Sequence, residues 1–195
     1  MTHAAHVMID IETLSLASNA AVWQVAWKDM ASDATQVAFL NPAEMREHVE
    51  CERLVEDPAT IEWTLKTYGA HSPFASWYSS YNRGKAFGGT HSVKDLHTDM
   101  ALTIGPATTV WAKGADFDFP ILTNLFSWIG ESAPWHYRNK ACMRTLKMLA
   151  ELEASETQLK ALAEMKNPSA HDAGADVLHQ TRQVDYYLGI LNVTL

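Results

Sequence analysis

Hydrophobic and polar positions alternate near the N-terminus, and this alternation predicts β-strands. In residues 6–12 every second side chain is aliphatic, while Asp10 and Glu12 occupy intervening positions on the opposite face. Further strands are expected over 21–27 and 35–40. The links between these three strands are short and hold Ser, Asn and Asp, so we expect an antiparallel meander.

A helical period replaces the alternation in the second part of the chain. Ser92 is a plausible N-cap for one of the helices, and residues 70–92 are expected to form a long connection with at most one helical piece. Single strands are expected between the later helices, at 108–114 and 136–143. The predicted helices cover 58–69, 92–103, 118–129, 144–153 and 172–188.

The order of elements, three strands followed by alternating helices and strands, predicts one α/β domain over residues 1–195. Its mixed five-stranded sheet should be flanked by helices. The chain has no apolar run as long as a membrane span and no signal-peptide pattern, so no membrane association and a cytoplasmic location are expected. Cys51 and Cys142 form no C-x-x-C pair, and no zinc-binding pattern is present.

Asp10 and Glu12 suggest a cation site on the first strand. Residues two apart on a strand lie about 6.5–7 Å apart on one face, so both carboxylates can coordinate a common site. Two like charges in a half-buried position are costly unless a cation or hydrogen-bond donors compensate them. Magnesium prefers oxygen ligands and suits this role. The alternative is an exposed edge with two solvated acids, and the pair alone does not decide between them.

Acidic residues also occur next to two later helices. In KGADFDFPIL, 113–122, both Asp116 and Asp118 follow a strand, where α/β proteins place ligands, and at least one of them is expected to cap the following helix. In HDAGADVLH, 171–179, two residues five apart cannot share one face of a helix. His171 is therefore expected on the turn before the last helix and Asp176 in its second turn, although an isolated histidine there is more often an ordinary surface residue.

Taken in order, these segments resemble the DEDDh 3′–5′ exonucleases of the DnaQ-like group, within the ribonuclease H-like fold. The resemblance is carried by DIET (10–13), GADFD (114–118) and HDAGAD (171–176). It is greatest to the small phage exonucleases of the DexA type, through IDIETL, VWAKGADFDFPIL, PW-x-x-R followed by RTL, and H-x-A-x-x-D. This likeness covers nearly the whole chain except 70–107, and it is consistent with a phage or prophage origin.

The resemblance implies roles for individual residues. His171 corresponds to the general base, and Thr13 and Leu14 to contacts with the terminal nucleotide, although Leu14 fits a core position equally well. Four carboxylates suit two divalent cations, Mg²⁺ with Mn²⁺ as a substitute. The implied metal ligands are Asp10, Glu12, Asp118 and Asp176.

The implied activity is release of nucleoside 5′-monophosphates from single-stranded 3′ ends by two-metal-ion hydrolysis, with DNA placed before RNA as the substrate. A 3′–5′ exoribonuclease is the alternative, because no sensor of the 2′-OH can be located in the sequence. A ribonuclease H-type endonuclease and a non-catalytic end-binding module are further alternatives. The net charge of −8 argues against tight non-specific duplex binding. Aromatic and basic residues in 77–85 suit either base stacking or a loop anchored by its aromatics, with the anchored loop preferred.

Overall fold

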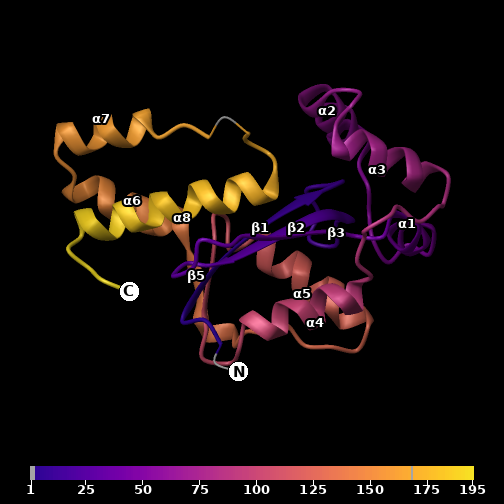
Figure 1. Ribbon diagram of the computed structural model, residues 1–195, viewed down its shortest axis with the longest axis horizontal. Helices are drawn as coiled ribbons and strands as arrows, with labels where there is room; N and C mark the ends of the chain where they lie inside the picture. Colours follow the sequence, from indigo (N-terminus) through magenta and orange to yellow (C-terminus); the bar gives the residue numbers. More distant parts are fainter. Residues whose placement is uncertain (1–2, 168) are drawn as a thin grey trace.

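A mixed five-stranded sheet forms the centre of the computed structural model, which describes residues 3–167 and 169–195 (Figure 1). The strands lie in the order β3-β2-β1-β4-β5, with β1 in the middle. β1 pairs antiparallel with β2, and β2 with β3, whereas β1, β4 and β5 run parallel. This confirms the predicted meander and the α/β class. The strands are β1 (His6–Thr13), β2 (Val22–Asp29), β3 (Gln36–Phe39), β4 (Thr109–Ala112) and β5 (Lys140–Cys142).

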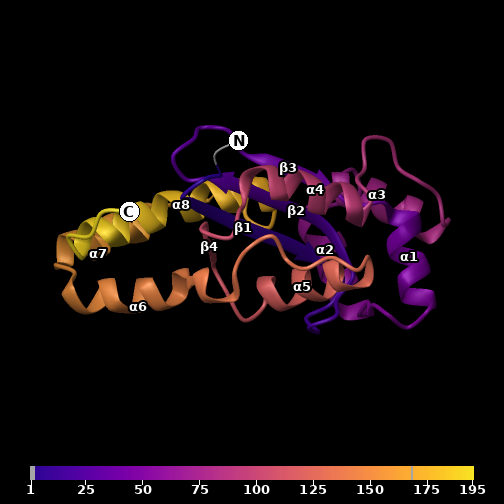
Figure 2. The same ribbon diagram turned by 90° about the horizontal axis from the view of Figure 1, so that it is seen from below.

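Helices cover both faces of the sheet, as the two perpendicular views show (Figures 1 and 2). The first five helices pack on one face, and α6 and α8 pack on the other. The helices are α1 (Pro42–Glu50), α2 (Pro58–Tyr68), α3 (Pro73–Asn82), α4 (Val93–Thr103), α5 (Asp118–Trp128), α6 (Met143–Glu153), α7 (Glu156–Glu164) and α8 (Ala173–Ile190), with a 3-10 turn at Tyr137–Asn139. Among the described residues, no helix is both long and apolar enough to cross a bilayer.

The alternation along β1 divides the core into two parts. Val7, Ile9 and Ile11 belong to the larger cluster with α1–α5, whereas Met8 belongs to the smaller cluster with α8. Since side chains two apart share a face, the carboxylates that follow Met8 on β1 point toward α8. The sequence pattern therefore placed the acids correctly, on the face opposite the main core.

The predicted contact between Leu14 and the terminal nucleotide is wrong. The Leu14 side chain is fully buried in the larger core cluster, so it is not available to contact a nucleotide. The β1–β2 register shifts between Glu12 and Thr13, and such a bulge turns the residues beyond it away from strict alternation. Leu14 consequently faces the core, which was the alternative reading of this position.

Two helices were not predicted, and a third lies in the expected connection. α1 begins at Pro42 with Asn41 as its N-cap, where the sequence suggested only the end of a strand. α7 begins with a capping box at Ser155 and has no fully buried residue. The Ser92 N-cap of α4 is confirmed, and its side chain accepts a hydrogen bond from the N–H of Asp95.

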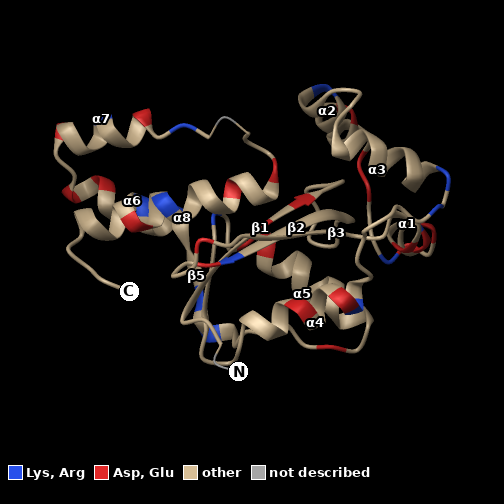
Figure 3. Ribbon diagram, in the orientation of Figure 1, with Lys and Arg blue, Asp and Glu red and all other residues tan. Residues whose placement is uncertain are grey.

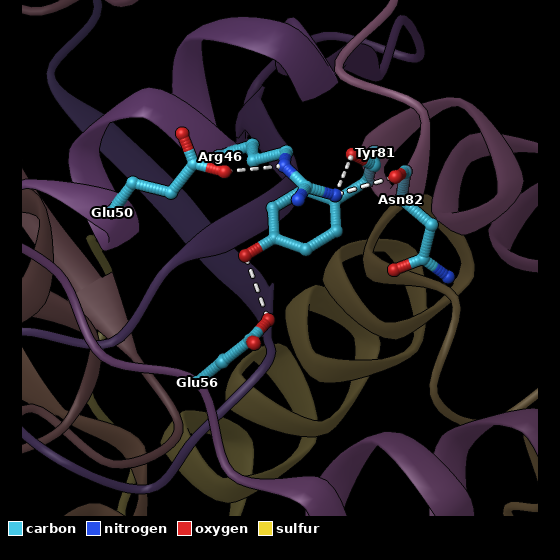
Figure 4. Close-up of polar contacts among 5 residues, drawn as sticks. All are labelled: Arg46, Glu50, Glu56, Tyr81 and Asn82. Atoms are coloured by element: carbon cyan, nitrogen blue, oxygen red, sulfur yellow. Dashed lines mark hydrogen bonds and ion pairs between the residues drawn. The ribbon is translucent and has the colours of Figure 1, made fainter.

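The aromatic stretch at 77–85 contributes to the core through α3. Trp77 and Tyr81 are 0% and 3% exposed, which favours anchoring over base stacking. Arg46 of α1 donates from Nη1 to the carbonyl oxygens of Tyr81 and Asn82, at 3.2 and 2.5 Å, and so satisfies the end of α3 (Figure 4). The Tyr81 hydroxyl in turn donates to Glu56 at 2.7 Å. Residues 77–82 thus belong to a helix, whereas 83–85 follow its end, and the buried aromatics Trp77 and Tyr81 are structural.

Candidate active site

Acidic positions of β1, of the start of α5 and of the start of α8 lie near one another at one end of the sheet (Figure 3). Within β1, only His6–Ile9 pair with β4, so Asp10 and Glu12 lie beyond the last β1–β4 pair. The chain leaves β4 through a short turn and enters α5 at Asp118, which brings this carboxylate back to the same edge. α8 crosses this region with Asp176 near its start.

Asp10 lies deep in the cluster. It is 9% exposed, and burial, followed by the charge of Asp118, raises its pKa well above the usual range. The side-chain amide of Gln180 donates to Asp10 Oδ1 at 2.7 Å and opposes this effect. The electrostatic surroundings therefore leave the negative charge of Asp10 largely uncompensated.

Asp118 occupies the first position of α5 and is 5% exposed. Burial raises its pKa to about 7, although backbone hydrogen bonds and the guanidinium of Arg144 act in the opposite direction. Arg144 reaches this region across Gly114, where a Cβ would lie 3.1 Å from Nη1. Asp116 is exposed, and no side chain forms a capping hydrogen bond at α5, so the expected cap is not present.

Glu12, His171 and Asp176 form the more open side of the cluster. One potential ligand atom from each lies within 4.8 Å of the others. Burial, then the charges of Asp10 and Asp176, raises the pKa of Glu12 to about 9. The structure thus brings together all five residues that the sequence suggested as metal ligands or general base.

The turn before α8 holds His171 in an unusual backbone conformation, with φ at 73°. Its N–H donates to Asp176 Oδ2 at 3.0 Å, and the Asn167 amide donates to the other oxygen. Asp176 lies in the first turn of α8, not the second, because the helix begins only at Ala173. His171 itself lies on the preceding turn, as predicted.

A buried glutamine on β2 attaches this turn to the sheet. Gln24 is 1% exposed and pairs with Glu12 across the strands. Its amide nitrogen donates to Asp172 Oδ2, and its oxygen accepts from the N–H of Ala173, both at 3.1 Å. Asp172 is the N-cap of α8, so Gln24 fixes the start of the helix that carries Asp176.

A pocket of about 550 Å³ adjoins the cluster on the side of His171. Leu16, Trp63 and Phe117 supply apolar surface, and Glu12 and Thr13 line its inner part. Leu16 and Trp63 are 78% and 48% exposed, so both present apolar surface to solvent beside the carboxylates. The Trp63 and His171 rings meet edge to face with centroids 4.8 Å apart.

Sequence reasoning missed several residues around the cluster. Gln180 follows Asp176 by one helical turn, and that spacing was a usable signal. Arg144 matched the resemblance but had no assigned role. Leu16, Trp63 and Gln24 reach the site through tertiary contacts, and no local pattern pointed to them.

Residues 5–188 match the family model of the 3′–5′ exoribonuclease Rv2179c-like domain. The chain belongs to this family. No curated protein matched the sequence, and the narrower likeness to DexA-type exonucleases stays a prediction.

Solved structures of exonuclease I share the fold. The zinc-bound complex of E. coli exonuclease I with single-stranded DNA superimposes with a TM-score of 0.63 at 13% identity, over 98% of this chain and 42% of that one. A product-bound exonuclease I gives 0.60 at 14% identity, over 96% and 44%. The present chain thus spans less than half the length of these proteins. The match confirms the ribonuclease H-like exonuclease fold.

Proposed function

We propose that this chain is a metal-dependent 3′–5′ exonuclease that acts on single-stranded ends and releases nucleoside 5′-monophosphates. The main support is that acidic side chains from β1, α5 and α8 lie together beside an exposed histidine. Several of these acids are buried deeply enough to raise their pKa values. The family match supports the reaction class. Buried acids of this kind remain in a fold as protonated groups or as ligands of cations.

The donor chemistry fits hard divalent cations. The proposed ligands Asp10, Glu12, Asp118 and Asp176 offer only oxygen atoms, which suits Mg²⁺, with Mn²⁺ as a substitute. Their raised pKa values reflect a concentration of negative charge that cations would neutralise. When bound, two such cations would activate the attacking water and stabilise the departing 3′ oxygen.

His171 is proposed to accept the proton of the attacking water. Its side chain is exposed, and one ring nitrogen lies within 4.8 Å of carboxylate oxygens of Glu12 and Asp176. The hydrogen bond from the backbone N–H of His171 to Asp176 fixes the turn, and the edge-to-face contact with Trp63 orients the imidazole ring. The base is therefore held at the boundary between the carboxylates and the pocket.

The cation-free protein should lose stability as the pH rises. The pKa of Glu12 is raised from 4.5 to about 9 and that of Asp118 from 3.8 to about 7, so both bind protons more tightly when the chain is folded. Their stabilising contribution is complete below about pH 4 and is lost as the pH rises through these values. Thermal unfolding measured in EDTA across this range checks the direction.

Magnesium should reverse this loss, and most strongly at alkaline pH, because cations bind the ionised carboxylates of the folded state. The same unfolding series with MgCl₂ in place of EDTA measures the difference. A melting temperature that does not respond to Mg²⁺ at any pH would contradict the cation site, as would full nuclease activity in excess EDTA.

We propose that the pocket beside His171 receives the 3′-terminal nucleotide. Leu16 and Trp63 present exposed apolar surface next to the carboxylates, a position in which a base can stack. Leu16 rather than Leu14 is proposed to contact the terminal nucleotide, since the β1 bulge turns Leu14 into the core. Thr13 lines the pocket, but its hydroxyl donates to the Ser15 carbonyl at 2.6 Å.

Trp63→Ala should raise KM for a single-stranded oligonucleotide about tenfold or more, because stacking on an aromatic contributes about 1–3 kcal/mol per base. The value of kcat should fall less, since the carboxylates remain. Tyr137→Ala is the matched control: Tyr137 is 65% exposed and does not line this pocket, so its loss should leave KM unchanged. Steady-state kinetics on all three proteins test the assignment, and an unchanged KM for Trp63→Ala would remove Trp63 from the subsite.

We propose RNA as the preferred substrate, which reverses the order expected from sequence alone. The support is the description of the matching family as exoribonucleases over residues 5–188. The single-stranded DNA in the exonuclease I complex belongs to a protein that shares the fold at 13% identity. RNA and DNA oligonucleotides of matched sequence, end-labelled and incubated with Mg²⁺, should differ in rate in favour of RNA.

The same oligonucleotides distinguish an exonuclease from its alternatives. A free 3′ end should be shortened one nucleoside 5′-monophosphate at a time, whereas a 3′-blocked strand and a circular single strand should both resist. Cleavage of the circle would favour the endonuclease. Binding of ends in Mg²⁺ without any released mononucleotide would favour the non-catalytic module.

A further inference from the structure

The side chain of Gln180 joins α8 to Asp10, a buried carboxylate of the cluster. Gln180 is 1% exposed, and its Nε2 donates to Asp10 Oδ1 at 2.7 Å, across 170 residues of sequence. It lies one helical turn after Asp176, so both side chains project from the same face of α8. The docking of one helix thus sets two contacts at the site.

The second polar atom of this amide is unsatisfied. Gln180 Oε1 is buried and has no hydrogen-bond partner among the described residues. Rotating the amide would bring this oxygen against an Asp10 carboxylate oxygen, which also accepts, so the donating orientation is the one that an ionised Asp10 selects. A hydrocarbon side chain of similar shape would avoid the orphaned oxygen, and general packing therefore does not explain a glutamine at this position.

We propose that Gln180 is a positioning residue that holds the Asp10 carboxylate in the orientation required for divalent-cation binding. This inference rests on the proposed function, in which Asp10 is a cation ligand. The amide occupies one lone pair of Oδ1 and fixes the carboxylate plane, which leaves Oδ2 and the remaining lone pair of Oδ1 for the cation. Hydrogen bonds of this kind to ligating groups typically change metal affinity or activity 10–100-fold.

Gln24 forms a second side-chain contact that holds α8, at the start of the helix. It ties the start of α8 to β2 through Asp172 and Ala173, so the helix is fixed at its beginning, and Gln180 fixes the next turn against β1. Gln24 touches no proposed ligand directly in these bonds. Gln180 is therefore the residue whose loss should alter cation binding while the helix stays docked.

The test is a titration of wild type and Gln180→Met with Mn²⁺ alone, in which isothermal calorimetry measures the binding. Met keeps the unbranched shape but cannot donate, so the dissociation constant for Mn²⁺ should rise about 10–100-fold. The melting temperature in EDTA should stay close to wild type, because the orphaned oxygen is also removed. The Mn²⁺ concentration that gives half-maximal nuclease rate should shift by a similar factor, and excess Mn²⁺ should restore much of the rate.

Thr181→Val is the matched control, because Thr181 is the next buried residue on α8 and its hydroxyl donates only within the helix, to the Val177 carbonyl at 2.9 Å. Its Mn²⁺ affinity should equal wild type. Gln180→Leu provides a second donor-free variant should Gln180→Met not fold. Unchanged Mn²⁺ affinity in whichever donor-free variant folds, or an equal loss in Thr181→Val, would overturn the role of Gln180.

Asp10→Asn separates this inference from the proposed function. Loss of Mn²⁺ binding in Asp10→Asn, together with wild-type affinity in the Gln180 variants, overturns only the positioning role. If wild type and Asp10→Asn bind Mn²⁺ equally, or if wild type binds none, the assignment of Asp10 as a ligand fails, and the inference fails with it.

Discussion

Asp118→Asn should lower the nuclease rate by about 10³-fold or more, because cation ligands act as a unit and the loss of one disables the set. Asp118 is 5% exposed at the start of α5, close enough to Asp10 for its charge to raise the pKa of Asp10. Asparagine keeps the shape of the side chain but supplies no negative charge. Rates with saturating oligonucleotide and Mg²⁺ measure the loss.

The same substitution should stabilise the cation-free protein at alkaline pH. Burial raises the pKa of Asp118 to about 7, so above that pH the wild type carries a buried charge that the neutral amide does not. The advantage in melting temperature should be absent near pH 4 and grow through neutrality. A variant that is both inactive and more stable in EDTA is the expected signature of a buried ligand.

Asp116→Asn is the matched control. Asp116 is exposed in the turn between β4 and α5, two residues before Asp118, and makes no capping bond to the helix. It should keep most of its activity and lose at most about 1 kcal/mol of stability, the scale of a local turn contact. An inactive Asp116→Asn beside an active Asp118→Asn would overturn the alignment of this motif and the set of proposed ligands.

Local patterns were sufficient for the central part of the fold. The alternation along β1 placed Val7 and Ile9 in one core cluster and Met8 in the other, because strand periodicity depends on neighbouring residues alone. α1 and α7 were missed although N-caps mark where both begin, and both bury few side chains: α1 buries only Pro42 and Met45, and α7 buries no residue fully. Their helical state depends on caps and on neighbours distant in sequence.

The site likewise contains residues that the sequence indicated and residues that only the structure reveals. The pair of acids on β1 suggested a cation site, and the resemblance carried by DIET, GADFD and HDAGAD indicated the four carboxylates and His171. Gln180 contacts Asp10 from 170 residues away, and Gln24 contacts Asp172 from 148 residues away, so only the packed chain reveals these bonds. Leu14 was misassigned because a β-bulge after Glu12 interrupts the alternation, and the sequence carries no clear signal of that bulge.

His171→Ala should lower the rate by about 10²–10⁴-fold, the usual contribution of a positioned general base. His171 has φ at 73°, a region that asparagine tolerates better than most residues, so His171→Asn should keep the turn while removing the base. Both variants should bind Mn²⁺ as wild type does, because the four carboxylates remain. Kinetics and Mn²⁺ calorimetry on the two variants therefore separate catalysis from cation binding.

Added imidazole makes the test specific to proton transfer. The His171 side chain is exposed and adjoins a pocket of about 550 Å³, so a free imidazole can enter the space left in His171→Ala and restore part of the rate. It should restore little in His171→Asn, where the amide fills that space. His97→Asn serves as the control. His97 lies on α4, away from the carboxylates, and its ring bonds the Ser132 carbonyl, so this variant should retain full activity. A His171 variant that loses Mn²⁺ affinity together with its rate would show that His171 is a cation ligand instead of the base, and a variant with near-full activity would remove it from the mechanism.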